Sequence, residues 1–138
     1  MTAWAAPYVG LPFVDGGRTM TGVDCWGLVR LVLWRERRVD VPTYGEISAL
    51  DLVARARAFR SRQAERPWQV VDVEPEPFDV VLICAPDRPV IAHVGIMTDG
   101  CNFLHVERAS DSVITPVSHL LYRDRILGYR RHELLCPT

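Results

Sequence analysis

Three residues of this 138-residue chain have the side chains needed for nucleophilic attack on an acyl group: Cys25, His93 and His105. Cys25 lies in the run from Gly22 to Leu28 (GVDCWGL), where a turn is expected to lead into an amphipathic helix. The first turn of a helix presents N–H groups without intrahelical partners and the positive end of the helix dipole. A thiol in such a position has a lowered pKa and carries more of the nucleophilic thiolate. With one histidine as base and a second to orient it, the pattern predicts a cysteine hydrolase.

The spacing of the two histidines places a geometric requirement on a hairpin. Asp99-Gly100 is a hairpin signal between segments 91–98 and 102–107. Facing residues of an antiparallel pair have a constant index sum, so His93 and His105 share a face only if the connection has an odd number of residues. We expect a three-residue loop such as 99–101, or a five-residue loop, and we expect the shorter one to place the histidines directly opposite each other, ~5 Å apart at Cβ.

A helix is expected to position the cysteine. Apolar residues recur at helical spacing from Cys25 onward, and Asp24 is placed to cap the first turn. We therefore expect a helix from Cys25 to about Arg38, with Trp26 and Trp34 as residues that pack it. The backbone N–H of Cys25 is expected to be one oxyanion donor.

The rest of the chain predicts a second helix and a sheet. Residues 48–63 begin with a pattern that resembles a capping box and are expected to form a helix. Beyond them the sequence changes to short β-rich segments, and strands are expected at 68–73, 79–84, 91–98, 102–107, 113–116 and 126–132. This order predicts one α+β domain spanning residues 1–138, with helices packed on a five- to six-stranded antiparallel sheet.

Composition limits the function classes. Lys and Arg total 16 against 17 Asp and Glu, a formal net charge of −1, which gives no support to nucleic-acid or membrane-surface binding. The chain has no apolar run approaching ~20 residues, so no membrane anchor is expected. Its first residues lack a signal-peptide pattern, and synthesis in a cytoplasm is expected.

The candidate residues also have simpler interpretations. A cysteine on an apolar helix face is often a small core residue, and a histidine in an apolar strand is often a buried, hydrogen-bonded one. Zinc binding by Cys25, His93 and His105 is disfavoured because a fourth ligand and closely paired spacing are missing. Cys84, Cys101 and Cys136 are expected to be buried or incidental thiols, and no disulfide framework is expected.

Four ordered blocks resemble the NlpC-type cell-wall cysteine peptidases: 10–17 (GLPFVDGG), 22–27 (GVDCWG), 77–81 (PFDVV) and 93–96 (HVGI). The interval from His93 to His105 matches that family as well. The resemblance runs from about Tyr8 to His105. It implies a papain-like fold, catalytic Cys25, His93 and His105, no cofactor, and a peptidoglycan stem peptide as substrate, with a D-glutamyl–diamino acid bond as the expected point of cleavage.

Within that family, residues 24–30 (DCWGLVR) and 41–45 (VPTYG) are most similar to short tail-associated peptidases of bacteriophages and phage-like particles. The similarity implies tail-tip or hub proteins as partners, a place on the virion tail, and action in the periplasm or cell wall. Two alternatives stay open. One is a structural tail-tip component or plug that keeps the fold, and the other is an amidase or transpeptidase on the same scaffold.

Two departures from the family concern substrate binding. Phe13 stands where the family often has a tyrosine, so Tyr8 is expected to substitute for it. Trp26 stands where the family usually has a serine that, with the preceding aspartate, holds a free amine of the substrate. Asp24 is still expected to pair with an amine. Trp26 either packs the helix or walls the substrate groove, and both interpretations stay open.

Overall fold

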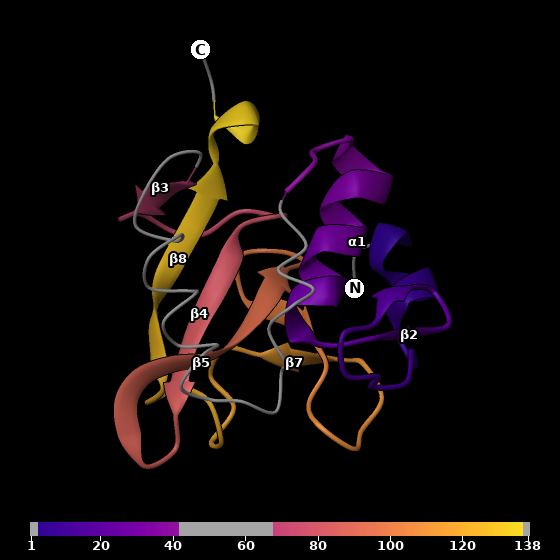
Figure 1. Ribbon diagram of the computed structural model, residues 1–138. Helices are drawn as coiled ribbons and strands as arrows, with labels where there is room; N and C mark the ends of the chain where they lie inside the picture. The colour runs from indigo at the N-terminus through magenta and orange to yellow at the C-terminus, as the bar shows by residue number, and fades with distance from the viewer. Residues whose placement is uncertain (1–2, 42–67, 137–138) are drawn as a thin grey trace.

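One helix lies against one antiparallel sheet in the computed structural model, which describes residues 3–41 and 68–136 (Figure 1). The helix α1 spans Cys25–Arg37. The six strands lie in the order β3-β8-β4-β5-β6-β7. Their bounds are β3 Trp68–Val71, β4 Val80–Ala85, β5 Arg88–Met97, β6 Asn102–His105, β7 Val113–Pro116 and β8 Ile126–His132. The described residues therefore form the expected α+β arrangement.

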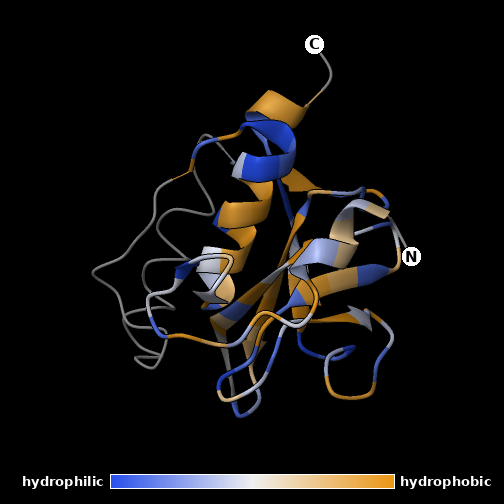
Figure 2. Ribbon diagram, turned by 90° about the vertical axis from the view of Figure 1, so that its right-hand side faces the viewer, coloured by the Kyte–Doolittle hydropathy of each residue, from blue (hydrophilic) through white to orange (hydrophobic). Residues whose placement is uncertain are grey.

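Helix α1 begins and ends as its sequence predicts. Asp24 is the N-cap, and its carboxylate accepts a hydrogen bond from the N–H of Gly27. At the other end Arg38 is left-handed, with φ of 55°, and its N–H bonds carbonyls of the preceding turn. Arg35 and Arg37 lie in the last turn, which Figure 2 colours as hydrophilic, and they complement the negative end of the helix dipole.

The sheet has a hydrophobic cluster on each of its faces. Alternate residues of a strand point to opposite faces, and Val94 and Ile96 of β5 belong to the larger cluster, which includes the buried side of α1. The smaller cluster contains Phe103 of β6 and Tyr122, from the segment that follows β7. The segment 117–125 thus covers part of the sheet.

The N-terminal residues wrap around the start of α1. A 3₁₀ helix, η1 (Ala3–Tyr8), leads to a small hairpin of β1 (Arg18–Thr19) and β2 (Gly22–Val23). Ser112 fixes this segment to the sheet, since its hydroxyl donates to the Tyr8 carbonyl at 2.5 Å and accepts from the Leu11 N–H at 2.8 Å.

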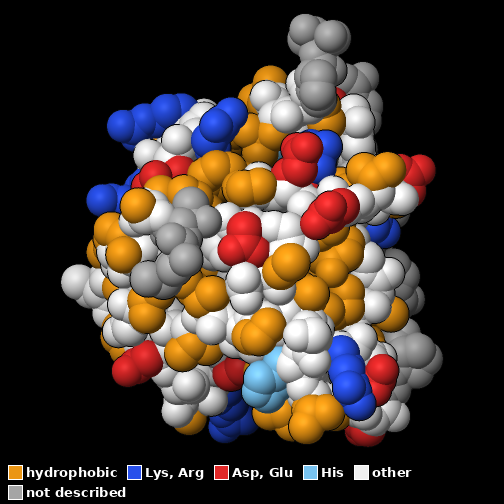
Figure 3. Space-filling model, turned by 180° about the vertical axis from the view of Figure 1, so that it is seen from behind, with side chains coloured by type: hydrophobic (Ala, Val, Ile, Leu, Met, Phe, Trp, Pro, Cys, Tyr) orange, Lys and Arg blue, Asp and Glu red, His pale blue; other side chains and the backbone are white. Residues whose placement is uncertain are grey.

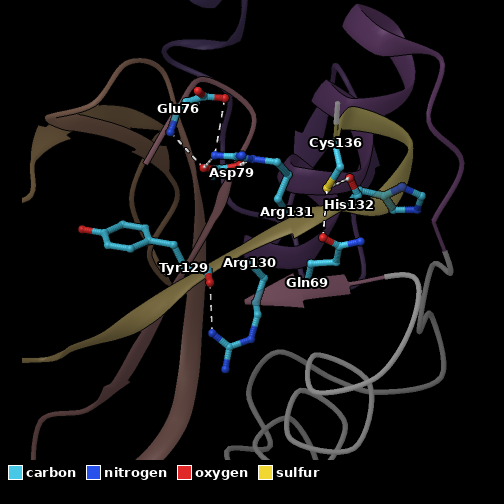
Figure 4. Close-up of polar contacts among 8 residues, drawn as sticks. All are labelled: Gln69, Glu76, Asp79, Tyr129, Arg130, Arg131, His132 and Cys136. Carbon is cyan, nitrogen blue, oxygen red and sulfur yellow. Dashed lines mark hydrogen bonds and ion pairs between the residues drawn. The ribbon is translucent and has the colours of Figure 1, made fainter. Parts of the chain in front are cut away.

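A buried ion pair joins β8 to the residue before β4 (Figure 4). Arg131 donates two hydrogen bonds to the carboxylate of Asp79, at 2.7 and 2.8 Å, and Asp79 is 1% exposed. The Asp79 carboxylate also accepts from the Glu76 N–H, and its hydrogen bonds raise the pKa of Arg131. The pair ties β8 to the segment before β4. Nearby, the Cys136 thiol donates to Gln69 and to the His132 carbonyl.

Most of the expected elements are confirmed, with small shifts of their ends. The helix matches at both ends, and each of the six expected strands is present. The second expected helix, 48–63, lies outside the described residues. Trp34 differs from expectation: its side chain is 45% exposed and lies beside the guanidinium of Arg38 rather than in the core.

Charges of both signs are interspersed with apolar side chains on the face seen in Figure 3. This distribution agrees with the nearly balanced composition of the chain. Among the described residues, no helix is long and apolar enough to cross a membrane.

Candidate active site

The cysteine half of the site, which we define as Gly16, Arg18, Asp24, Cys25 and Gly27, lies at the N-terminus of α1. Cys25 is the first helical residue, as predicted, and is 2% exposed. Its backbone therefore lies in the turn whose N–H groups precede the intrahelical ladder, at the positive end of the helix dipole. This position favours a thiolate over a thiol.

Asp24 orders the loop in front of the cysteine. One carboxylate oxygen accepts from the Gly27 N–H at 2.7 Å and from the Arg18 guanidinium at 2.6 Å. The other oxygen accepts from the Gly16 N–H at 3.0 Å. Because Asp24 is 2% exposed and both of its oxygens have partners, its main role in this structure is to cap α1 and to position the turn.

Gly27 allows the N-terminal hairpin to approach the helix. A Cβ at this position would lie 1.9 Å from the carbonyl oxygen of Gly17, which is a backbone atom. Only a residue without a side chain fits such an approach. The turn that ends in Asp24 is consequently pressed directly onto the first turn of α1.

The histidine half of the site, which we define as His93, His105, Glu107, Thr115 and Tyr122, lies on the sheet. The Nε2 atom of His93 lies 2.9 Å from Nδ1 of His105, within hydrogen-bond distance. The Nε2 atom of His105 lies 2.9 Å from the hydroxyl oxygen of Thr115 on the neighbouring strand β7. Three polar groups thus form a continuous chain across β5, β6 and β7, and it leaves Nδ1 of His93 on the side away from His105.

The hairpin has the expected parity but a different offset. Ile96 pairs with Leu104 and Met97 with Phe103, and the Thr98 N–H donates to the Asn102 carbonyl, which leaves the three-residue loop 99–101. These pairs have an index sum of 200, and only an extension of that sum past the end of β6 at His105 would set Glu107 opposite His93. The expectation that the two histidines lie directly opposite each other was wrong, because that arrangement needs a sum of 198. They are diagonal neighbours on one face, which is still within reach of two imidazoles.

The offset makes Gly95 necessary for the position of His105. A Cβ on Gly95 would lie 3.2 Å from Cβ of His105 and 2.8 Å from the Phe103 ring. The β4–β5 register also shifts between Ile83 and Cys84, next to the Ile83–His93 pair. Such irregularities change the direction of a side chain and are common beside active sites.

His105 is held as a neutral imidazole. Burial lowers its pKa to about 3, and the nearby charge of His93 acts in the same direction. The rings of Phe103 and Tyr122 pack against it, with centroids 4.4 and 5.0 Å away. A neutral imidazole donates through one nitrogen and accepts through the other. His105 can therefore accept a hydrogen bond from His93 while it donates one to Thr115.

Helix α1, which begins at Cys25, packs against β5, the strand that carries His93. Both residues are buried. The structure places the three expected catalytic residues at the helix start and on the two adjacent strands that sequence reasoning assigned to them.

Two of the expected substrate-binding residues, Tyr8 and Trp26, have contacts within the protein. The hydroxyl of Tyr8 donates to the carboxylate of Glu36, which lies 11 residues after Cys25, or ~16 Å along the helix. Trp26 is 3% exposed and packs edge-on against Trp68, with ring centroids 6.1 Å apart. Neither contact supports a role in substrate binding, and both residues stabilise the N-terminal segment and the core instead.

Glu107, Thr115 and Tyr122 were not found by sequence reasoning. Thr115 contacts His105 through the β6–β7 register. The Tyr122 hydroxyl donates to Glu107 at 2.9 Å, and Oε1 of Glu107 lies 3.7 Å from Nε2 of His93. The expected loop 99–101 has an index sum of 200, and this sum could have pointed to Glu107 as the residue opposite His93. Nothing in the sequence distinguished Thr115 and Tyr122 from ordinary strand and turn residues.

The histidine half has the geometry of a shared proton rather than of a shared metal ion. His93, His105 and Glu107 each offer a ligand atom, and these atoms lie within 4.8 Å of one another. Two nitrogens bound tetrahedrally to zinc at ~2.0 Å would lie about 3.3 Å apart. At 2.9 Å the two ring nitrogens point into a direct hydrogen bond, which uses the lone pair that a metal would need.

Proteins of similar sequence and of similar fold are known. The chain is 29% identical over 136 residues to the Gamma-DL-glutamyl hydrolase of Bacillus subtilis (strain 168), which covers 95% of this chain but only 28% of that protein. The fold resembles the crystal structure of the NlpC/p60 domain of the peptidoglycan hydrolase SagA, with a TM-score of 0.58, 19% identity, and coverage of 93% of this chain and 92% of that one.

Two further crystal structures share the fold. One is an NLP/P60-family protein, described as similar to lipoprotein, from Staphylococcus aureus subsp. aureus Mu50, with a TM-score of 0.64 and 22% identity over 93% of this chain and 38% of that one. The other is an NlpC/P60 family protein from Bacillus cereus ATCC 10987, with a TM-score of 0.65 and 22% identity over 91% of this chain and 36% of that one. Residues 10–131 match the NlpC/P60 family as a whole, a span that contains Cys25, His93 and His105. The chain therefore belongs to the NlpC/P60 family.

Proposed function

We propose that the protein is a cysteine peptidase that hydrolyses peptidoglycan stem peptides. The observation that carries the proposal is the pair of buried histidines joined at 2.9 Å beside the helix that begins at Cys25. Nε2 of His93 is bound to His105, and in the proposed reaction Nδ1 of His93 exchanges a proton with the thiol. A helix-terminal cysteine with an oriented imidazole is the arrangement that thiol-dependent acyl transfer requires.

The reaction follows from these groups. The Cys25 thiolate attacks the peptide carbonyl, and protonated His93 gives its proton to the leaving amine, so a thioester and a free amine form. Neutral His93 then removes a proton from water, and the resulting attack releases the carboxylic acid and restores the thiol. His105 keeps the His93 ring oriented through both steps. In the overall reaction one water molecule is consumed, and the peptide bond is converted into a carboxylic acid and an amine.

The substrate class is inferred from family membership and from the relative's activity. The Bacillus subtilis relative is named a Gamma-DL-glutamyl hydrolase, which supports a D-glutamyl–diamino acid bond as the point of cleavage. The test is digestion of purified muropeptides followed by mass spectrometry, with Cys25→Ala as the control. New fragments that end at the γ-glutamyl carbonyl support the proposal, and fragments cut at the amide that joins sugar to peptide would instead identify an amidase.

A thiol reagent tests the nucleophile without any choice of substrate. We expect iodoacetamide to modify Cys25 well below pH ~8.5, the value typical of a free thiol. Cys101 is exposed in the β5–β6 loop and provides an internal reference thiol in the same sample. If Cys25 is modified no earlier in a pH series than an ordinary thiol, the proposed mechanism is wrong.

We further propose that the enzyme is carried on a phage or phage-like tail and opens the wall during genome delivery. This rests on the similarity of residues 24–30 and 41–45 to tail-associated peptidases, and none of the relatives reported above is named as a tail protein. Mass spectrometry of purified tail particles from a producing strain tests it. If the protein is absent from such particles, or is recovered only in another compartment, tail delivery is rejected and the peptidase proposal is unaffected.

One observation favours the alternative of a structural module. Cys25 and His93 are 2% and 5% exposed, so a peptide reaches the sulfur only if covering residues move. A structural module predicts that Cys25→Ala particles infect normally and that the isolated protein releases no stem peptide. An active isolated protein excludes this alternative.

A further inference from the structure

Glu107 is a charged neighbour of the proposed catalytic histidine. Its Oε1 atom lies 3.7 Å from Nε2 of His93, the nitrogen that also bonds His105. Glu107 follows the end of β6 at His105 by two residues, and an extension of the β5–β6 index sum of 200 would set it opposite His93. A carboxylate thus lies close to the same ring nitrogen of His93 that bonds His105.

The carboxylate of Glu107 is held in place from a third segment. Tyr122 donates its hydroxyl proton to Oε1 of Glu107 at 2.9 Å, and its ring packs edge-on against His105. Burial and the charge of Glu107 raise the pKa of Tyr122 to about 12, so the hydroxyl stays protonated and remains a donor at neutral pH. Tyr122 is 8% exposed, whereas the Glu107 side chain is 44% exposed.

His105 alone supplies orientation without charge. Because it is neutral, it accepts a hydrogen bond from His93 but offers no negative charge to a protonated His93. Both proposed steps pass through protonated His93: it gives up its proton when the amine leaves, and it forms again when water attacks the thioester. In the second step Cys25 is acylated, so its thiolate no longer stabilises protonated His93.

We propose that Glu107 is a positioning residue that stabilises protonated His93, and that Tyr122 holds Glu107 for this role. The inference rests on the proposed peptidase function and adds an electrostatic component to it. An opposite charge within about 4–6 Å favours the charged form of a titratable group. Partial exposure of Glu107 weakens the effect through solvent and salt screening.

The titratable groups around His93 come from several elements. Cys25 comes from α1, which packs on β5, His105 comes from β6, and Glu107 follows β6. Behind them the segment after β7 contributes Tyr122, and the charges of His119 and Arg125 act on His105 in the direction opposite to Glu107. Glu107 is therefore the acidic group that these described residues bring to His93.

The experiment compares three variants with the wild-type chain. Glu107→Gln removes the charge and keeps an oxygen that Tyr122 can bond, Tyr122→Phe removes the hydroxyl and keeps the ring on His105, and Asp124→Asn removes a carboxylate that is 90% exposed in the same segment. For each we measure the pH profile of kcat/KM on muropeptides, the rate of Cys25 alkylation against pH, and the thermal midpoint.

We expect Glu107→Gln to move the alkaline limb of kcat/KM to lower pH by about one unit and to slow Cys25 alkylation at neutral pH. Tyr122→Phe should shift the alkaline limb and slow the alkylation in the same direction, but by less. Glu107→Asp should retain part of the wild-type pH profile and alkylation rate. Asp124→Asn should change neither the pH profile nor the alkylation rate. Raising the salt concentration should narrow the gap between wild type and Glu107→Gln.

Two failures are distinguishable. If the wild-type thiol is activated but Glu107→Gln has the wild-type pH profile, or loses rate equally at every pH, the inference about Glu107 is wrong while the proposed function survives. If wild-type Cys25 reacts as an ordinary thiol and no muropeptide is cleaved, the proposed function fails first. A fall in the thermal midpoint of Glu107→Gln without any shift of the profile would indicate a structural role and overturn the inference.

Discussion

The cysteine half and the histidine half of the site are held by different kinds of structure. The cysteine half is built within 12 consecutive residues, 16–27, by a helix cap, an ion pair and one tightly packed glycine. The histidine half is built from residues 93–122, which belong to three strands and the segment after them. Local contacts form the first half, and the register of the sheet forms the second.

This difference predicts how each half responds to change. A cap and a turn are set by a few backbone angles, so a substitution there acts mainly on the start of α1. A polar chain across strands depends on every register pair that precedes it. The histidine half should therefore be the more sensitive one in activity, and the cysteine half in local stability.

The largest expected effect is the loss of either reacting side chain. Cys25→Ser and His93→Gln should each lower muropeptide hydrolysis by at least about 10⁴-fold, because thiol and imidazole act as one unit in both steps. The double variant should be no worse than the worse single variant, and circular dichroism should show an unchanged fold. A double variant whose losses multiply would mean that the halves act separately.

The comparison also shows why sequence reasoning reached one half more fully than the other. Asp24, Cys25 and the helix start were predictable because capping and helical periodicity are local signals. The shared face of His93 and His105 followed from parity alone, and the expected loop 99–101 was found; because that loop has an index sum of 200, it already implied a diagonal offset rather than direct opposition. Thr115 and Tyr122 needed the β6–β7 register and the return of the segment 117–125 onto the sheet.

Trp26 had two interpretations, packing of the helix or a wall of the substrate groove, and its contacts in the structure agree with the first. Its position on α1 directs it toward Trp68 and the core, where its large apolar surface is buried. Helical phase was a better guide for this residue than the family alignment of its position. Tyr8 gives the same lesson, since its hydroxyl bonds Glu36 near the far end of α1.

Two glycines allow the halves to be broken separately. In Gly27→Ala the new methyl group would lie 1.9 Å from a backbone oxygen, and in Gly95→Ala it would lie 2.8 Å from the Phe103 ring and 3.2 Å from Cβ of His105. We expect Gly27→Ala to lower the free energy of unfolding by about 3 kcal/mol, the upper part of the range for overpacking. Gly95→Ala should cost less stability but about 10²-fold in kcat, because it displaces His105.

Chemical denaturation and kinetics on the same samples check the glycine prediction. Gly100→Ala is the matched control, since the nearest atom to its Cβ is the end of the flexible Glu74 side chain. Equal losses of stability and activity in both site variants would contradict a division of the site into two separately held halves.

Acid should weaken the histidine half before the cysteine half. His105 has a folded pKa of about 3 against ~6.5 in an unfolded chain, so the unfolded state binds more protons between these values. Its contribution to stability is complete above pH ~6.5 and is lost as the pH falls toward 3. Between pH 7 and 5 we expect the wild-type chain to lose at most about 2 kcal/mol of unfolding free energy through this group.

Urea unfolding at pH 7, 6 and 5 tests the acid prediction. His105→Asn should have a flatter dependence on pH than wild type, and His119→Asn, which changes an exposed histidine, should retain the wild-type slope. The buried His132, whose pKa is also lowered, contributes equally to all three proteins and cancels in the comparison. Identical slopes for wild type and His105→Asn would mean that His105 is not held neutral by burial.

The smallest expected effect is at the far end of the polar chain. Thr115→Val keeps the shape and strand preference of the side chain but removes the hydroxyl 2.9 Å from Nε2 of His105, and leaves that buried nitrogen unpaired. We expect a loss of about 1 kcal/mol in stability, the low end for a buried unsatisfied group, and a fall of about tenfold in kcat. Thr115→Ser keeps a hydroxyl and should stay near wild type in kcat. If both variants lose the same activity, Thr115 acts through packing rather than through its hydrogen bond, and the chain of polar groups that distinguishes the histidine half ends at His105.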